Sequence, residues 1–398
     1  MAPPTFLNLQ NGFYNALTQG LGISPDGGFQ LAQPSPPLVP GKTQDQALWN
    51  YFNLIPPFTL TNNYVLSPGN QFFSNYSGLL SALHGAPNTF QQDVGPECFK
   101  AWNIYANTLP LTVSLNQFPA IFQRWATLNG YISVANKGAT DLAAMILDPI
   151  TAAQLAIMPY SGTAPANLPN WDAGYDNLIQ MLAVAPSTAF KYDSSTDSSD
   201  VRNTWCNGSE SIFFGLWSNS SSSSSQSAIF ASAAVSLTAS FQHVMQFTAV
   251  PGSWYSSSAM GDAFSNKSDP PWNPGPQGIT WKTTFDPTSG NMARFAGNIV
   301  VASGMYMQVE SAASYSESDQ SAITQASSAG MWPFYSSNSN SGTNTHATFN
   351  SKGNMTIIIT SQPGVPIVLG VTVVPVAQFV GTAVEGAKLH ATAMKKRS

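Results

Sequence analysis

The sequence contains few charged residues. Asp, Glu, Lys and Arg make up 8% of its 398 residues, and the formal net charge is −5. Soluble domains usually contain roughly 25% of these residues. A nucleic-acid-binding protein needs clustered Lys and Arg to displace counterions, so this composition excludes nucleic acid as the expected partner. Ser, Thr, Asn and Gln must supply most of the polar surface.

Cysteine is also scarce. The chain has two, Cys98 and Cys206, and neither lies in a CxxC motif. A disulfide between them would close a loop of roughly a hundred residues and contribute a few kcal/mol in an oxidising compartment. The spacing leaves open a disulfide or a single reactive thiol, but two buried or unreactive thiols are the simplest expectation.

Motifs that carry common chemistries are missing. The sequence has no GxSxG elbow, Walker loop, GxGxxG after a strand, HExxH or zinc-spaced Cys/His set. Three carboxylates, Asp193, Asp197 and Asp200, fall in the stretch DSSTDSSD and could hold calcium. That stretch lacks the ligand alternation and Gly of an EF-hand, so a solvated loop is expected. We therefore predict neither a metal nor a cofactor.

Targeting segments are not evident either. The start, MAPPTFLNLQ, lacks the basic region and apolar run of a signal peptide. The most apolar window, 365–384, contains Pro366, Gly370 and Pro375 and alternates like a strand, which argues against a membrane-spanning helix. The sequence thus predicts no signal peptide or transmembrane helix and leaves the compartment open.

The strongest structural signal is the stretch 233–250. Apolar residues occupy alternate positions, as at Leu237, Phe241 and Phe247, and Ser236, Ser240 and Gln242 occupy the positions between. This period of two predicts a half-buried strand. At about 3.3 Å per residue the strand would extend over roughly 55 Å, longer than usual, so it must bend or project.

A second alternating stretch, 295–315, predicts another long strand, with a bend or bulge at Ser303 and Gly304. A helix over 292–302 is the alternative for its first half. Residues 347–350, 355–360 and 365–379 predict further strands joined by tight turns.

The earlier part of the chain has helical periodicity. Apolar residues recur at three- and four-residue spacing from Phe118, with Gly138 as the expected end, and further helices are predicted over 44–54, 140–147 and 175–182. Asp148 and Pro149 predict the cap and first turn of another helix. Residues 1–42 are rich in Gly and Pro, so we expect an extended strap there rather than regular helix or central strand.

These patterns predict an α+β protein. Helices should dominate about 43–185 and antiparallel strands about 228–380, which gives a helical N-terminal half and a β-sandwich-like C-terminal half with long strands. Composition divides the chain into a strap at 1–42, a mainly helical region at 43–200 and a mainly β region at 201–398.

His243 is the single candidate catalytic residue. It lies on the apolar side of the long strand, where burial would lower the pKa of its imidazole and a nearby carboxylate could make it a base. A hydrogen-bonded core histidine is the structural alternative. Potential acid or base partners are few, and they are Asp172, Asp176, Asp262, Asp286 and Glu310.

Three function classes remain open. A non-enzymatic binding or self-assembling protein fits the low charge and the missing motifs. An enzyme with a site between the helical and β halves is the alternative, and a membrane-active β-pore-forming protein is the second, because alternating strands can insert into a bilayer. A small-molecule ligand is compatible with all three. Low charge and scattered aromatics also predict a homo-oligomer that uses loops containing Trp254, Trp272 or Trp332.

Overall fold

The computed structural model describes residues 6–23, 28–32, 38, 40–57, 70–85, 89–161, 167–198, 223–267, 271–273, 278–326 and 343–380. The chain forms two compact units that alternate along the sequence. Unit 1 is built from the described parts of 1–69, 173–249 and 295–374, and unit 2 from those of 70–172, 250–294 and 375–398. Each unit therefore combines pieces of more than one of the segments 1–42, 43–200 and 201–398.

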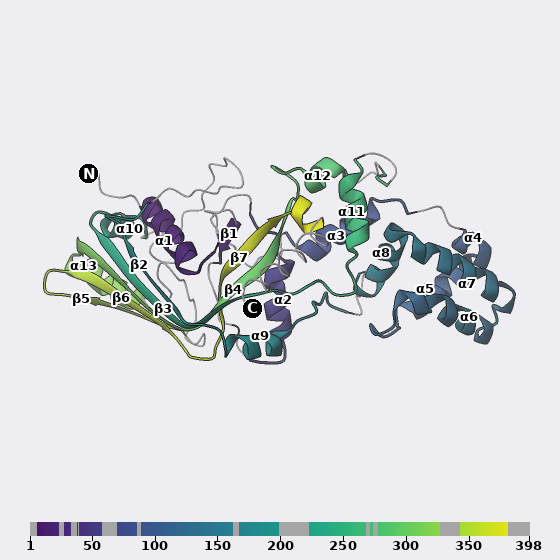
Figure 1. The fold of residues 1–398 in the computed structure, drawn as a ribbon, viewed down its shortest axis with the longest axis horizontal. Coiled ribbons are helices and arrows are strands. Elements are labelled where there is room, and N and C mark those ends of the chain that lie inside the picture. The colour runs from purple at the N-terminus through teal and green to yellow at the C-terminus, as the bar shows by residue number, and fades with distance from the viewer. Residues whose placement is uncertain are drawn as a thin grey trace, which may run out of the picture. The chain divides into compact units, whose positions relative to one another are not determined.

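Unit 1 contains a seven-stranded antiparallel sheet (Figure 1). Five strands are neighbours in the order β1 (Gly28–Leu31), β7 (Ile367–Pro375), β4 (Arg294–Ser314), β3 (Val235–Phe247) and β2 (Thr188–Asp193). β6 (Asn354–Ser361) pairs with β4, and β5 (Thr343–Phe349) pairs with β6. Since most helices lie earlier in the chain and most strands later, the predicted α+β class is confirmed.

The two long strands are present where the alternation predicts them. β3 and β4 pair from Val235 with Ser311 to Phe247 with Ile299, so the helix predicted as an alternative over 292–302 is wrong. At Gly304 the backbone has φ 62°, while the register is the same on both sides. The interruption is therefore a bend without an inserted residue, and glycine suits it because other residues rarely adopt that φ.

The alternation in β3 also places the side chains as predicted. Leu237, Phe241 and Phe247 are buried, whereas Ser240 and Gln242 are exposed and Ser236 is half-buried. Leu237 and Phe241 pack in one apolar core with the inward residues of β2, β4, β5 and β6, whereas the ring of Phe247 lies against Phe52 of the segment 44–53.

Helices cover the apolar face of this sheet. α1 (Phe6–Gly20), α10 (Ser223–Ala231) and α13 (Glu317–Ala326) contribute Leu9, Phe13, Phe230 and Ile323 to the same core (Figure 1). The second layer is thus helical, in place of the second sheet of a sandwich.

The prediction of an extended strap over 1–42 is wrong for the part of it that the structure describes as helix and strand. Residues 6–20 form α1 because apolar side chains recur there at helical spacing, and 28–31 form β1.

Two further helices belong to unit 1. They are α2 (Gln44–Asn53) and α9 (Tyr175–Leu182). The Tyr175 amide donates to Asp45 Oδ1 at 2.7 Å, so a carboxylate of α2 satisfies a free amide in the first turn of α9.

Unit 2 is mainly helical. Its elements are α3 (Phe72–Ser81), α4 (Phe90–Val94), α5 (Pro96–Ala106), η1 (Leu115–Gln117), α6 (Phe118–Leu128), α7 (Ile132–Leu147), α8 (Pro149–Ile157), η2 (Met158–Tyr160), α11 (Ser257–Ser265) and α12 (Trp281–Phe285). The predicted cap is confirmed, because the Thr151 amide donates to Asp148 Oδ1 at 2.7 Å.

The predicted helix end at Gly138 is wrong. The chain turns at Gly130, whose φ is 84°, and α7 then continues through Gly138 without a break. A Cβ at Gly138 would lie 2.4 Å from Cε1 of Phe122 and 2.7 Å from Cγ1 of Val94. This glycine therefore allows close helix packing rather than ending a helix.

Aromatic side chains fill the interior of unit 2. Trp102 is 1% exposed, and its ring lies 5.0 Å from Phe122 and 5.5 Å from Trp125 between ring centroids. Trp254 and Trp272 are 0% and 5% exposed. The indole nitrogens of both donate to backbone carbonyls inside the unit, so the two rings belong to its interior. Self-association through the loops that contain them stays a prediction. Trp332, the third predicted contact, lies outside the described residues.

Candidate functional site

Unit 2 contains a pocket of about 400 Å³. The end of α5, the connection to η1, the start of α6, α8, η2 and Ser253 form its wall. Most of the described lining is apolar, and Leu109, Val113, Leu115 and Phe118 form part of it. The volume falls within the range of small-molecule sites, which are about 300–1,000 Å³.

Short local contacts shape the 107–114 connection that forms one side of the pocket. The Thr108 hydroxyl donates to the Tyr105 carbonyl at 2.7 Å, and the Val113 amide donates to the Pro110 carbonyl at 2.9 Å. At its end, the Ser114 amide donates to Gln117 Oε1 at 2.9 Å. Leu109 and Val113 are partly buried against the aromatic core, so the connection is fixed at both ends and along its apolar side.

Tyr160 provides the most enclosed polar side chain of the described lining. Tyr160 is 2% exposed, and its Oη lies 3.1 Å from Ser253 Oγ and 3.3 Å from Asn170 Oδ1. The Trp254 indole donates to the Asn170 carbonyl at 2.8 Å. These bonds orient the Tyr160 hydroxyl, while Ser253 is exposed and faces the pocket.

The described lining of the pocket is uncharged. Its polar side chains are Thr112, Ser114, Asn116, Tyr160 and Ser253, each of which can donate and accept hydrogen bonds. An ionic ligand would leave water without a counter-charge in this lining, which is costly. The arrangement can therefore hold a neutral, mainly apolar molecule with a polar group near Ser253.

His243, the predicted catalytic residue, lies in unit 1 and not among the lining residues of this pocket. Its side chain is half-buried on β3, and its Nδ1 lies 2.7 Å from the Ala185 carbonyl oxygen. Across the sheet it pairs with Ser303. Its observed partner is thus a backbone carbonyl, and catalysis by His243 stays a prediction.

The predicted acid and base partners are spread over the two units. Asp172 and Asp286 accept hydrogen bonds from the Val250 and Thr288 amides, at 2.7 and 2.9 Å, and Asp176 and Asp262 are exposed. The bonds from Thr288 lower the pKa of Asp286. Glu310 pairs with Ser236, seven residues before His243 on β3, so roughly 23 Å of strand separates it from the histidine.

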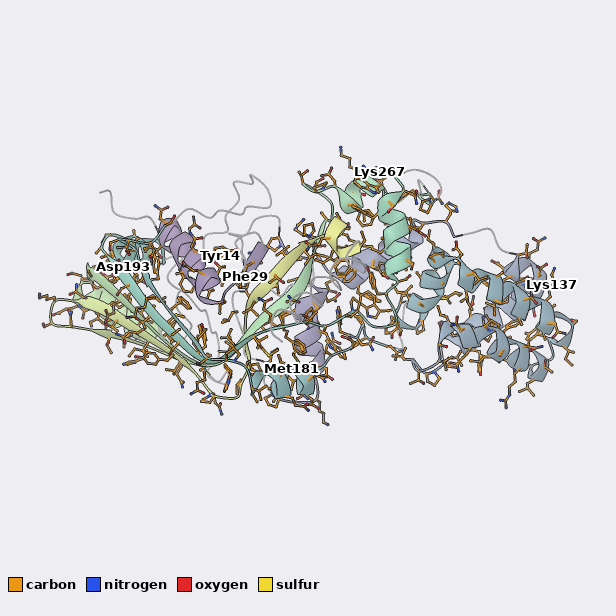
Figure 2. The ribbon with its side chains drawn as sticks, viewed as in Figure 1. Tyr14, Phe29, Lys137, Met181, Asp193 and Lys267 are labelled. Carbon is orange, nitrogen blue, oxygen red and sulfur yellow. The ribbon has the colours of Figure 1, made fainter. Side chains whose placement is uncertain are left out.

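The acidic loop forms a hydrogen-bonded turn after β2, where Asp193 lies (Figure 2). Asp193 Oδ1 accepts from the Ser195 hydroxyl and amide, which lower the pKa of this carboxyl. Asp197 Oδ2 accepts from the Asp193 amide, and Asp200 lies outside the described residues. Within the described ranges, no three His, Cys, Asp or Glu side chains gather as metal ligands would.

Among the described residues, the charged side chain that is buried is a cation. Arg294, at the start of β4, is 3% exposed, and the sequence analysis did not single it out. Cys98 is a buried free thiol whose pKa burial raises, as expected of an unreactive cysteine. Cys206 lies outside the described residues.

Within the described part of the chain, no single helix is long and apolar enough to cross a membrane. The consecutive segments 132–147 and 149–160 pass that test only as a pair, by length and composition, and are bent by 106°. No protein-family model, curated protein or solved structure matches the chain.

Sequence reasoning missed the pocket for a physical reason. Its lining comes from three stretches, around 106–118, 155–160 and 253, and none contains a titratable cluster or a known motif. The available signal was the stretch TLPLTVS between two helical segments. It contains a proline and is apolar, although connections between helices usually lie at the surface and are polar.

Proposed function

We propose that the chain is a non-enzymatic binding protein whose pocket in unit 2 takes a small, neutral and mainly apolar molecule. The observation that carries the proposal is the uncharged 400 Å³ pocket with Tyr160 and Ser253 held together at its wall. Few and well-placed polar groups in an apolar lining are typical of small-molecule sites, and the described lining contains no titratable Asp, Glu, His, Lys or Cys side chain to serve as an acid, base or strong nucleophile.

Nile red, a neutral apolar dye, serves as the probe. Its fluorescence should rise on binding to the full chain. Ala156, on α8, lines the pocket, and Ala156→Phe should raise the Kd at least tenfold because the ring occupies ligand volume. Ala120 is exposed on α6 and outside the lining, so Ala120→Phe is the matched control. No binding by the wild type, or equal binding by both variants, rejects the proposal.

A second measurement concerns polarity. Ser253→Ala removes a hydroxyl that faces the pocket but leaves the apolar lining intact. A ligand with a hydrogen-bonding group should lose about 3- to 10-fold in affinity, as expected for one neutral hydrogen bond of about 1 kcal/mol. A hydrocarbon such as naphthalene should bind equally to both proteins.

Self-association remains a proposal beside this one. With Trp254 and Trp272 buried, an interface would have to use other side chains, and low charge would make it insensitive to salt. Light scattering after size exclusion at low and high salt tests it. A monomer at tens of micromolar in both conditions rejects self-association and leaves the pocket unaffected.

Membrane activity is a second candidate, favoured by the turn between α6 and α7. Leu128 and Ile132 flank it and are 74% and 68% exposed. Exposed large apolar residues often mark a contact surface. Dye release from phosphatidylcholine vesicles should then occur with the wild type and be lost in Leu128→Ser/Ile132→Ser.

An enzymatic alternative predicts that His243→Ala abolishes turnover of a substrate that the pocket variants still convert.

A further inference from the structure

One face of the sheet in unit 1 is not covered by the helices that form its core. The outward residues of β2, β3, β4, β6 and β5 lie on it, opposite the face that packs against α1, α10 and α13. We call this the open face and define it by the cross-strand rows that contain Ser236, Thr238 and Ser240. Thr238 and Ser240 are exposed and Ser236 is half-buried, whereas the residues between them are buried.

The register aligns side chains from five strands into rows. The middle row contains Lys191, Thr238, Gln308, Ile358 and His346. The next contains Ala189, Ser240, Tyr306, Thr360 and Asn344. With strands about 4.8 Å apart and same-face residues about 6.6 Å apart, three rows across five strands cover about 19 Å by 13 Å.

Hydrogen bonds hold the central polar side chains in place. The Tyr306 hydroxyl donates to Gln308 Oε1 at 3.0 Å, and Gln308 Nε2 donates to Glu310 Oε1 at 2.8 Å. Ser236 donates to the other oxygen of Glu310 at 3.5 Å. Because hydrogen bonds already hold these side chains, they lose less conformational entropy when a ligand binds to them.

The side chains of the open face limit the chemical class of partner that it could bind. A nucleic acid needs a cluster of cations, whereas the single Lys of these rows, Lys191, lies two residues from the carboxylate of Asp193 on the same strand. A lipid surface needs large exposed apolar side chains, whereas most positions here are hydroxyls and amides. A protein partner typically buries Trp, Tyr or Arg anchors, and these rows contain one such residue, Tyr306, 41% exposed.

We propose that the open face binds a neutral polysaccharide. Hydroxyl and amide groups both donate and accept hydrogen bonds, which matches the hydroxyl groups of an uncharged sugar chain. The exposed ring of Tyr306 offers an apolar surface for the C–H face of a sugar ring beside those groups. The nearly balanced charge neither attracts nor repels such a chain, and rows that continue across five strands offer an extended polymer several contacts along its length. This site is independent of the pocket in unit 2.

Co-sedimentation of the full chain with insoluble cellulose, chitin, starch and curdlan tests the proposal. We expect binding to at least one of them, with a Kd at least tenfold higher in Ser240→Lys and in Tyr306→Ala/Gln308→Ala. The first variant adds charge and bulk to the face, and the second removes the ring and the amide. Ser318→Lys on α13 is the matched control, since Ser318 is exposed and outside the face. Thermal melts confirm that each variant is folded.

Four outcomes overturn the proposal. They are no binding to any of the four polysaccharides, equal binding by the wild type and both open-face variants, stronger retention on heparin than on the neutral polymers, and a wild-type dimer that Ser240→Lys dissociates in light scattering. The last would assign the face to a second copy of the chain. None depends on Nile red binding, so failure here is distinct from failure of the pocket proposal.

Discussion

The two units build their apolar cores from different side chains and different secondary structure. In unit 1 an alternating sheet buries aliphatic side chains such as Ile357 and Val309 on one face and leaves the other polar. In unit 2 short helices meet through aromatic rings, as at Trp102 and Phe122. The comparison teaches that a strand separates polar and apolar residues by alternation alone, whereas short helices need large rings to fill the space between them.

The largest effect is expected from Trp102→Ala. The ring is 1% exposed and has four aromatic neighbours, so its loss should lower the free energy of unfolding by about 3–5 kcal/mol, through lost burial and a cavity. Urea denaturation followed by circular dichroism measures this. Ile104→Ala, on the same helix at 63% exposure, should stay within about 0.5 kcal/mol. Equal effects of the two variants would contradict the aromatic core.

Phe241→Ala tests the sheet in the same way. Phe241 is 2% exposed on β3 and stacks on Phe190, with ring centroids 6.3 Å apart. We expect a loss near the lower end of the same range, about 3 kcal/mol, because it has fewer ring neighbours. Ser240→Ala, one residue away on the polar side, is the control. A thermal-melt shift within error of the wild type for Phe241→Ala would reject the burial of this face.

Two glycines sharpen the comparison at a smaller scale. In Gly138→Ala the new methyl group meets the side chains of Phe122 and Val94, whereas in Gly370→Ala it meets the backbone oxygen of Gln30 at 2.3 Å. Side chains can move aside, whereas the backbone of a paired strand cannot. Both substitutions should lower the free energy of unfolding by about 1–3 kcal/mol, with the larger decrease for Gly370→Ala. Urea denaturation of both variants measures this, and a larger decrease for Gly138→Ala would show that the helix packing of unit 2 is more rigid than the pairing of β1 with β7.

The smallest expected effect is a change in the pH dependence of stability, and it concerns Asp141 of unit 2. Burial raises the pKa of Asp141, and neighbouring Asp93 raises it further, while Lys137 lowers the pKa of Asp93 (Figure 2 labels Lys137). A raised native pKa means that Asp141 favours folding when protonated, and this contribution is lost as pH rises through that pKa. Asp141→Asn should therefore raise the Tm slightly at pH 7 and leave it unchanged near pH 3. A lower Tm at pH 7 would show that the carboxylate stabilises the fold.

The sequence predicted the long strands and the Asp148 cap because their signals are local. The period of two in 233–250 depends only on which face is apolar, and the cap depends on residues 148–151. It did not predict that helices would cover the sheet, since alternation says that a face is buried and not what buries it. It also placed a helix end at Gly138, where the glycine's role depends on Phe122 from another helix.

The candidate sites were less predictable. The pocket in unit 2 depends on three separated stretches, and the rows of the open face depend on the register of five strands. Low composition in charged residues agrees with the uncharged described lining of the pocket, but composition does not indicate where such a site lies. His243 was singled out because it lies on the apolar side of the long strand, and its observed partner is the Ala185 carbonyl.

The pairing of β1 with β7 has a consequence for how the protein is made. Gly28 pairs with Val373, so 345 residues separate the two partners along the chain. At a synthesis rate of about 5–20 residues per second, β1 leaves the ribosome roughly 17–70 s before its partner strand exists. During that interval β1 has no native partner in the sheet, and the last step in completing unit 1 must follow the synthesis of β7.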